Sequence, residues 1–207
     1  MIKYCTVKNE GSAELVIEKS RFIGRIRGVV SKDEADCFFS EIRKAHRTAT
    51  HNVPAFVIGE GMQSQWASDD GEPQGSSGAP IVQMLVSEGV TNAAVMVTRY
   101  FGGVKLGVGG LVRAYTATAK AALEDAGIVA VESGAAFRCE IDYPYQSKLK
   151  MMAERNGFIL GDLAYAEAIS FTLTVREEDA ERAMSAVMDL TGGTGRLIRR
   201  DCCEIRV

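Results

Sequence analysis

The stretch RYFGGVKLGVGGL, residues 99–111, joins a strand to a helix through a glycine-rich loop and thereby sets the fold around it. The preceding residues, 93–98, are nearly all apolar, which is typical of a buried strand. After the loop, apolar residues recur at spacings of four and three, which predicts an amphipathic helix that ends at Gly127. The expected buried face of this helix is Leu111, Tyr115, Ala119, Leu123 and Ala126.

This stretch, here called the second glycine loop, suits close approach of the backbone to a ligand, because glycine lowers the barrier to positive φ. The helix expected to open at Gly109 and Gly110 presents free N–H groups, which attract anions such as phosphate. The spacing matches neither common nucleotide-binding fingerprint, and a tight packing corner is the alternative. The candidate binding residues, three of them cationic, are Arg99, Tyr100, Gly102, Gly103, Lys105, Gly107, Gly109, Gly110 and Arg113.

A first glycine loop, SDDGEPQGSSGAPI at residues 68–81, carries a dense acidic cluster. Its carboxylates could bind a hard cation such as magnesium, or one could have a raised pKa suited to acid–base chemistry. They could equally cap the following helix, hold a turn or form a contact surface, since Asp-Gly and Glu-Pro are turn dipeptides. The candidate binding residues here are Asp69, Asp70, Gly71, Glu72, Pro73 and Gly75.

Aromatic residues flank both loops. Trp66 precedes the acidic cluster, and Tyr100 and Phe101 precede the glycines of the second loop. Such rings can stack on bases or anchor a protein partner, or they can belong to the core at a strand end. For Phe101 the core position is favoured.

Composition narrows the class of protein. The 207 residues are 46% hydrophobic and 25% charged with a net charge of −3, so we expect a globular protein without an overall basic field. None of the five cysteines forms a metal-binding pair, and the two histidines have no nearby acid, so we expect no metal, cofactor or catalytic residue. The first 20 residues lack a signal-peptide pattern, and uncharged runs reach about half a membrane span, which favours a cytoplasmic protein without membrane contact.

The periodicity predicts an α+β protein of two domains, residues 1–132 and 135–207, with a linker at Ser133-Gly134. In the first domain, residues 13–30 alternate as strand material, and Ser31 with Glu34 forms a capping box that opens a helix. The second domain alternates strand, helix, strand, strand, helix and strand. This order is typical of the ferredoxin-like fold, and its expected elements cover residues 137–142, 145–156, 158–165, 169–175, 177–190 and 196–206.

Several motifs, taken in order, resemble the YigZ/IMPACT family, in the two-domain layout of its bacterial members. They are EKSRFI at residues 18–23, ATHN at 49–52, SDDGEP at 68–73, RYFGG at 99–103 and LGVGGL at 106–111. The resemblance implies a first domain similar to the ribosomal-protein-type domain IV of elongation factor G, and a second similar to its domain V. It also implies a connection with translation. One departure is Val53, which stands where family members often have cysteine.

We therefore expect a non-enzymatic cytoplasmic binding protein linked to translation, which contacts RNA, the ribosome or a ribosome-associated protein through the two glycine loops. Two alternatives remain at the same loops. One is a hydrolase or transferase that acts on a phosphorylated small molecule, and the other is a module that binds only protein.

Overall fold

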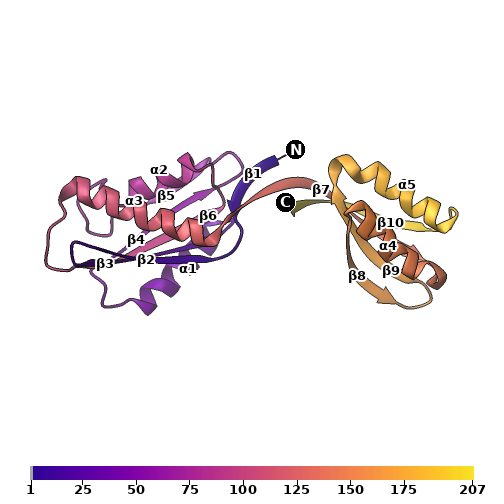
Figure 1. Ribbon diagram of the computed structural model, residues 1–207, viewed down its shortest axis with the longest axis horizontal. Helices are drawn as coiled ribbons and strands as arrows, with labels where there is room; N and C mark the ends of the chain where they lie inside the picture. The colour runs from indigo at the N-terminus through magenta and orange to yellow at the C-terminus, as the bar shows by residue number, and fades with distance from the viewer. Residues whose placement is uncertain (1) are drawn as a thin grey trace. The chain divides into compact units, whose positions relative to one another are not determined.

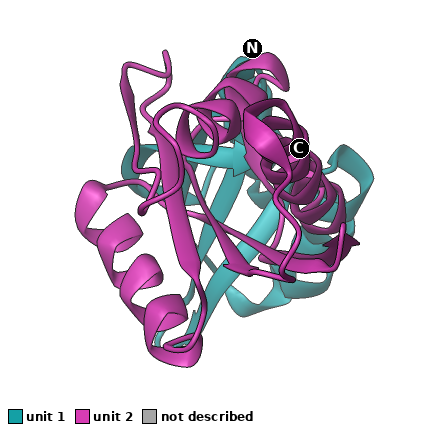
Figure 2. Ribbon diagram, turned by 90° about the vertical axis from the view of Figure 1, so that its left-hand side faces the viewer, with its two compact units in different colours: residues 1–3, 131–207 teal, residues 4–130 magenta. Residues whose placement is uncertain are grey.

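The computed structural model describes residues 2–207, which form two compact units. Unit 2 comprises residues 4–130, and unit 1 comprises residues 131–207 together with residues 2–3 (Figure 2). Each unit is built around its own antiparallel sheet and has its own hydrophobic core. No helix within residues 2–207 has the length and apolar character needed to cross a bilayer.

Unit 2 is a three-layer arrangement in which helices cover both faces of an antiparallel sheet (Figure 1). The strand order is β2 (Gly11–Ile17), β3 (Ser20–Gly28), β6 (Ala93–Tyr100), β4 (His51–Ile58) and β5 (Ser64–Ala67). Helix α1 (Lys32–Ala45) packs on one face, and α2 (Gly78–Ser87) and α3 (Gly107–Ala126) pack on the other. Residues 93–97 of β6 are fully buried because this strand lies at the centre of the sheet between two cores.

The capping box expected before α1 is confirmed. The Ser31 hydroxyl accepts a hydrogen bond from the Glu34 backbone N–H at 3.2 Å, and the Glu34 carboxylate accepts one from the Val30 N–H at 2.9 Å. These contacts satisfy N–H groups that a helix N-terminus otherwise leaves unpaired.

The strand segment expected over residues 13–30 is a hairpin, in which β2 and β3 pair along their length. Its turn residues, Glu18 and Lys19, have φ angles of 45° and 64°. Two-residue hairpin turns of this hand require positive φ at both positions and usually contain asparagine or glycine. The glutamate–lysine pair carries no such signal, so the sequence did not reveal the turn.

Unit 1 confirms the predicted strand–helix–strand–strand–helix–strand order. Its elements are β7 (Ile128–Ile141), α4 (Gln146–Asn156), β8 (Ile159–Tyr165), β9 (Ile169–Arg176), α5 (Ala180–Thr191) and β10 (Arg196–Arg206). The four strands lie in the order β10-β7-β9-β8, all antiparallel, and β1 (Ile2–Val7) also pairs with β7. Alternating apolar residues of β7 and β9 face α4 and α5, which encloses the core of this unit on one side of the sheet.

Two expected boundaries are wrong. Ser133 and Gly134 do not form a linker, because both lie inside β7 and pair with β10. The helix after the second glycine loop begins at Gly107 rather than at Gly109. The glycine pattern predicts a linker in the first case and a later helix start in the second, whereas the backbone hydrogen bonds of a strand or of a first helical turn tolerate glycine.

Candidate functional site

The two glycine loops meet through one buried ion pair. Glu72 lies in the first loop, and Arg99 lies at the end of β6, where the second loop begins. The Arg99 Nη1 donates to the Glu72 Oε1 at 2.6 Å, and the two side chains are only 6% and 4% exposed. The sequence placed both residues in the candidate site, and the structure brings them into direct contact.

Two further residues complete this pair, and sequence reasoning did not assign them to the site. The Tyr115 hydroxyl of α3 donates to the same Glu72 oxygen at 2.8 Å, and burial, followed by the Glu72 charge, raises its pKa. The Arg99 Nη2 donates to the Ser20 hydroxyl at 3.3 Å, whereas the buried Arg99 Nε has no partner among residues 2–207. In the sequence, Tyr115 stands out only as part of the apolar face of the helix, and Ser20 only as a member of the EKSRFI motif at residues 18–23.

His51 and Asp70 lie beside this buried network. The His51 Nδ1 donates to the Asp70 carbonyl at 2.7 Å, which requires the proton on that nitrogen, and its Nε2 lies 3.8 Å from Glu72. The Asp70 carboxylate accepts a hydrogen bond from the Asn52 N–H at 2.6 Å. Asp70 therefore holds the first loop against the start of β4.

Asp69 caps helix α2 from eight residues before its N-cap. Its carboxylate accepts hydrogen bonds from the Ser77 N–H and hydroxyl, the Gly78 N–H and the Gly75 N–H, at 2.7–3.1 Å. Burial raises its pKa, but the hydrogen bonds from Gly75, Gly78 and Ser77 outweigh burial and hold the pKa below its ordinary value. The capping role, one of the alternatives that the sequence left open, is the one that the structure displays.

Replacing Asp69 with asparagine is expected to lower the free energy of unfolding of unit 2 by about 1–2 kcal/mol, because an amide nitrogen would face the Gly75 N–H. The lowered pKa means that this stabilisation is present above about pH 4 and is lost as the pH falls through the folded-state value. Urea unfolding of both proteins, followed by the single tryptophan, Trp66 of unit 2, measures the difference. A difference that persists unchanged at pH 3 would contradict the carboxylate's role.

The remaining glycines of the first loop and Pro73 serve the turn itself. Gly71 and Gly75 have φ angles of 88° and 74°, which side chains rarely adopt. The Pro73 carbonyl accepts hydrogen bonds from the Ser76 N–H and hydroxyl, and the ring itself is exposed.

The glycines of the second loop have different roles. A Cβ at Gly102 would overlap the Lys19 backbone carbonyl, so this glycine packs against the β2–β3 turn. Gly103 and Gly107 have φ angles of 85° and 68°. At Gly110 a Cβ would come within 2.9 Å of the Leu106 Cβ, whereas at Gly109 the nearest atom is the Arg113 Nη1 at 3.7 Å. Only some of these glycines are therefore explained by packing or by backbone conformation.

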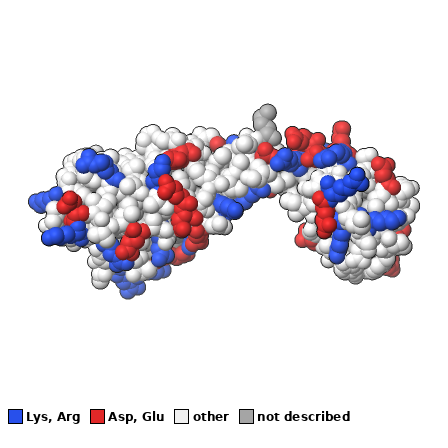
Figure 3. Space-filling view, in the orientation of Figure 1, with Lys and Arg blue, Asp and Glu red and all other residues white. Residues whose placement is uncertain are grey.

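The outer side of this loop is basic and partly apolar. Phe101 and Val108 are 46% and 58% exposed. Three cations of the same region, Lys19, Lys105 and Arg113, are also exposed. None of them makes an ion pair or a side-chain hydrogen bond with any of residues 2–207. Lys and Arg are visible at this end of unit 2, where α3 begins (Figure 3). We call this region the second-loop surface, defined as Lys19, Phe101, Lys105, Val108 and Arg113.

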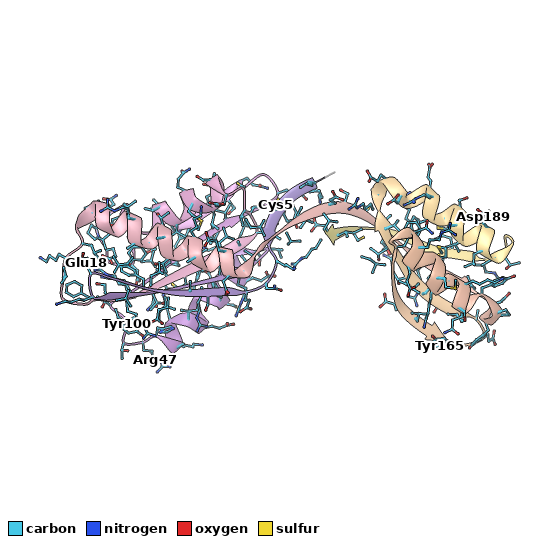
Figure 4. All side chains as sticks on the ribbon, in the orientation of Figure 1. Cys5, Glu18, Arg47, Tyr100, Tyr165 and Asp189 are labelled. Atoms are coloured by element: carbon cyan, nitrogen blue, oxygen red, sulfur yellow. The ribbon has the colours of Figure 1, made fainter. Side chains whose placement is uncertain are left out.

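Tyr100 turns to the other side of the β6 end, toward α1. Its hydroxyl lies 2.9 Å from the His46 Nδ1, and the Arg21 guanidinium lies over its ring at 5.8 Å. Burial lowers the pKa of His46, and the positive charges of Arg25 and Arg21 lower it further. Tyr100 and Arg47 lie near one another at this end of the unit (Figure 4).

Several known proteins are similar to this chain in sequence or in structure. The sequence model of the Impact N-terminal domain matches residues 18–123, and a domain of unknown function matches residues 139–194. IMPACT family member YvyE of Bacillus subtilis is 38% identical over 92% of this chain and 88% of that protein. A member from Haemophilus influenzae is 29% identical over 93% and 95%, and YigZ of Escherichia coli is 42% identical over 48% and 50%. A solved structure of a hypothetical protein has a TM-score of 0.63 at 25% identity, covering 95% of this chain and 97% of that one.

Proposed function

This chain belongs to the IMPACT family, and from that premise we propose that it is a non-enzymatic, cytoplasmic binding protein linked to translation. It contacts RNA, free or within the ribosome, through the second-loop surface. The observation that carries this proposal is the group of cations on that surface, Lys19, Lys105 and Arg113, which have no partner among residues 2–207.

The arrangement of charge supports a phosphate ligand. Some exposed cations of this unit are balanced by carboxylates, as Arg21 is by Glu14 at 2.7 Å, whereas others make no ion pair within residues 2–207. The second-loop surface adds three of these unpaired cations to the N-terminus of α3, whose first turn contains no acidic residue. Cations and free helical N–H groups together attract phosphate oxygens and leave room for the backbone of a nucleic acid.

The first glycine loop has a supporting role in this proposal. Asp69 and Asp70 already accept hydrogen bonds from backbone N–H groups, and Glu72 is buried against Arg99. Free carboxylates at the surface would repel RNA, whereas the Glu72 carboxylate is buried and holds Arg99, where the second loop begins. Phosphate release from a labelled nucleotide tests the enzymatic alternative, and nuclease-resistant capture of a protein partner tests the protein-only alternative.

Removing the three charges together, as Lys19→Ala, Lys105→Ala and Arg113→Ala, is expected to weaken binding of a fluorescein-labelled single-stranded RNA 12-mer at least about tenfold at low salt. The slope of log affinity against log salt should become shallower by about 2, because each phosphate contact on a single strand contributes roughly 0.7. Fluorescence anisotropy between about 50 and 200 mM salt measures both quantities.

The matched control removes three other exposed cations of unit 2, Lys32, Arg43 and Lys44 of α1, and so changes the net charge equally. We expect this variant to keep most of the salt dependence. Equal losses in the two triple variants would assign the effect to net charge alone. If neither labelled RNA nor purified ribosomes bind the parent protein at low salt, the proposed function is wrong.

A further inference from the structure

The Phe101 ring is an exposed aromatic group on a rigid support. Although 46% exposed, it lies over the buried Arg99 guanidinium, whose Cζ is 5.4 Å from the ring centroid. The same guanidinium lies 5.3 Å from the centroid of Phe22 and is held by Glu72. The sequence favoured a core position for Phe101, and the structure shows that only the underlying arginine is buried.

The backbone around this ring is also fixed. The Phe101 N–H donates to the Thr50 hydroxyl at 3.0 Å, and the Gly102 N–H donates to the Ser20 hydroxyl at 3.1 Å. A ring held in this way loses little conformational freedom when a ligand covers it, so more of the contact energy remains as affinity.

The surroundings specify the chemistry of the ligand. Lys19 adjoins Gly102 across the packing contact, and Lys105 and Arg113 follow in the same loop and helix. A ligand that satisfies both features has a flat apolar face and a nearby negative charge, which describes a nucleobase attached to a phosphate. Duplex RNA conceals the faces of its bases, whereas a single strand exposes them.

We infer that Phe101 is a stacking platform for an unpaired base of single-stranded RNA, with the adjacent phosphates held by Lys19, Lys105 and Arg113. This inference rests on the proposed function and adds a preference for single strands. The Arg99–Glu72 pair then acts as the support that holds the platform in position. Glu18, the exposed acid of the β2–β3 turn, opposes binding at the same place.

The experiment compares an oligouridine 12-mer with a 12-base-pair RNA duplex at equal salt. Phe101→Leu keeps an apolar cover over Arg99 but removes the aromatic face. It is expected to weaken binding of the single strand about 5- to 150-fold, the fold-change that corresponds to ~1–3 kcal/mol per stacked base. Binding of the duplex and the salt slope should be unchanged, and Glu18→Gln should strengthen binding of both RNAs.

A direct readout comes from Phe101→Trp in a Trp66→Phe background, in which the new tryptophan should be quenched by the single strand while affinity is retained. Trp66→Phe alone is the matched control, because Trp66 is another exposed aromatic of unit 2, 43% exposed and stacked on Phe56. If RNA binds but Phe101→Leu equals the parent and the tryptophan at 101 is not quenched, the stacking inference is wrong and the proposed function stands. If the parent binds neither RNA, the stacking inference is wrong, and the proposed function fails with it if purified ribosomes do not bind either.

Discussion

Replacing Glu72 with alanine is expected to lower the free energy of unfolding of unit 2 by about 3–5 kcal/mol, the cost of breaking a buried ion pair by removing one partner. Arg99, only 6% exposed, would keep its charge without a counter-ion, and the Tyr115 hydroxyl would lose its acceptor. The single tryptophan, Trp66, lies in unit 2, so its fluorescence during urea unfolding reports this unit.

Replacing all three buried side chains distinguishes two contributions to the free energy of unfolding. One is the net stabilisation by the ion pair, and the other is the destabilisation caused by a buried charge without a counter-ion. The combination of Glu72→Met, Arg99→Met and Tyr115→Phe leaves no unpaired polar atom of these side chains, and we expect it to recover most of the stability lost in Glu72→Ala. It should still weaken binding of single-stranded RNA at the second-loop surface, because Phe101 loses the guanidinium beneath it. A Glu72→Ala protein within about 1 kcal/mol of the parent would contradict this account.

The sequence predicted those parts of the fold that depend on local chemistry. The Ser31 cap, the apolar stripe of α3 and the order of elements in unit 1 all follow from periodicity and capping. The Glu18–Lys19 turn was not predictable in this way, because positive φ at both positions is imposed by strand pairing rather than by the residue types.

The sequence proposed candidate site residues but did not predict how they are arranged. Acidic residues in a loop can bind a cation, cap a helix or pair with a buried arginine, and only the tertiary structure assigns Asp69 to the second role and Glu72 to the third. Ser20 belongs to the site because β3 pairs with β6, a contact across 79 residues of sequence. Residue spacing within one segment carries no information on such contacts.

Replacing Gly102 with alanine is expected to be among the most damaging single changes in unit 2, with a loss of roughly 2–3 kcal/mol or more. The added Cβ would overlap the backbone of Lys19 and crowd that of Ser20, and neither can rotate away as a flexible side chain would. The displaced turn would also separate the Gly102 N–H from the Ser20 hydroxyl. Urea unfolding followed by Trp66 fluorescence measures the loss.

Gly109 is the matched control, because it lies in the first turn of α3 and a Cβ there would meet nothing closer than the Arg113 Nη1 at 3.7 Å. Gly109→Ala should leave unit 2 as stable as the parent or up to about 1 kcal/mol more stable, since alanine is the better helix former. Packing therefore gives no reason for glycine at this position, whereas a phosphate that approaches the N–H groups of α3 does. Gly109→Val, folded but bulky, should weaken RNA binding, and if it binds RNA as the parent does, the phosphates are held by the cations alone and not by the helix N-terminus.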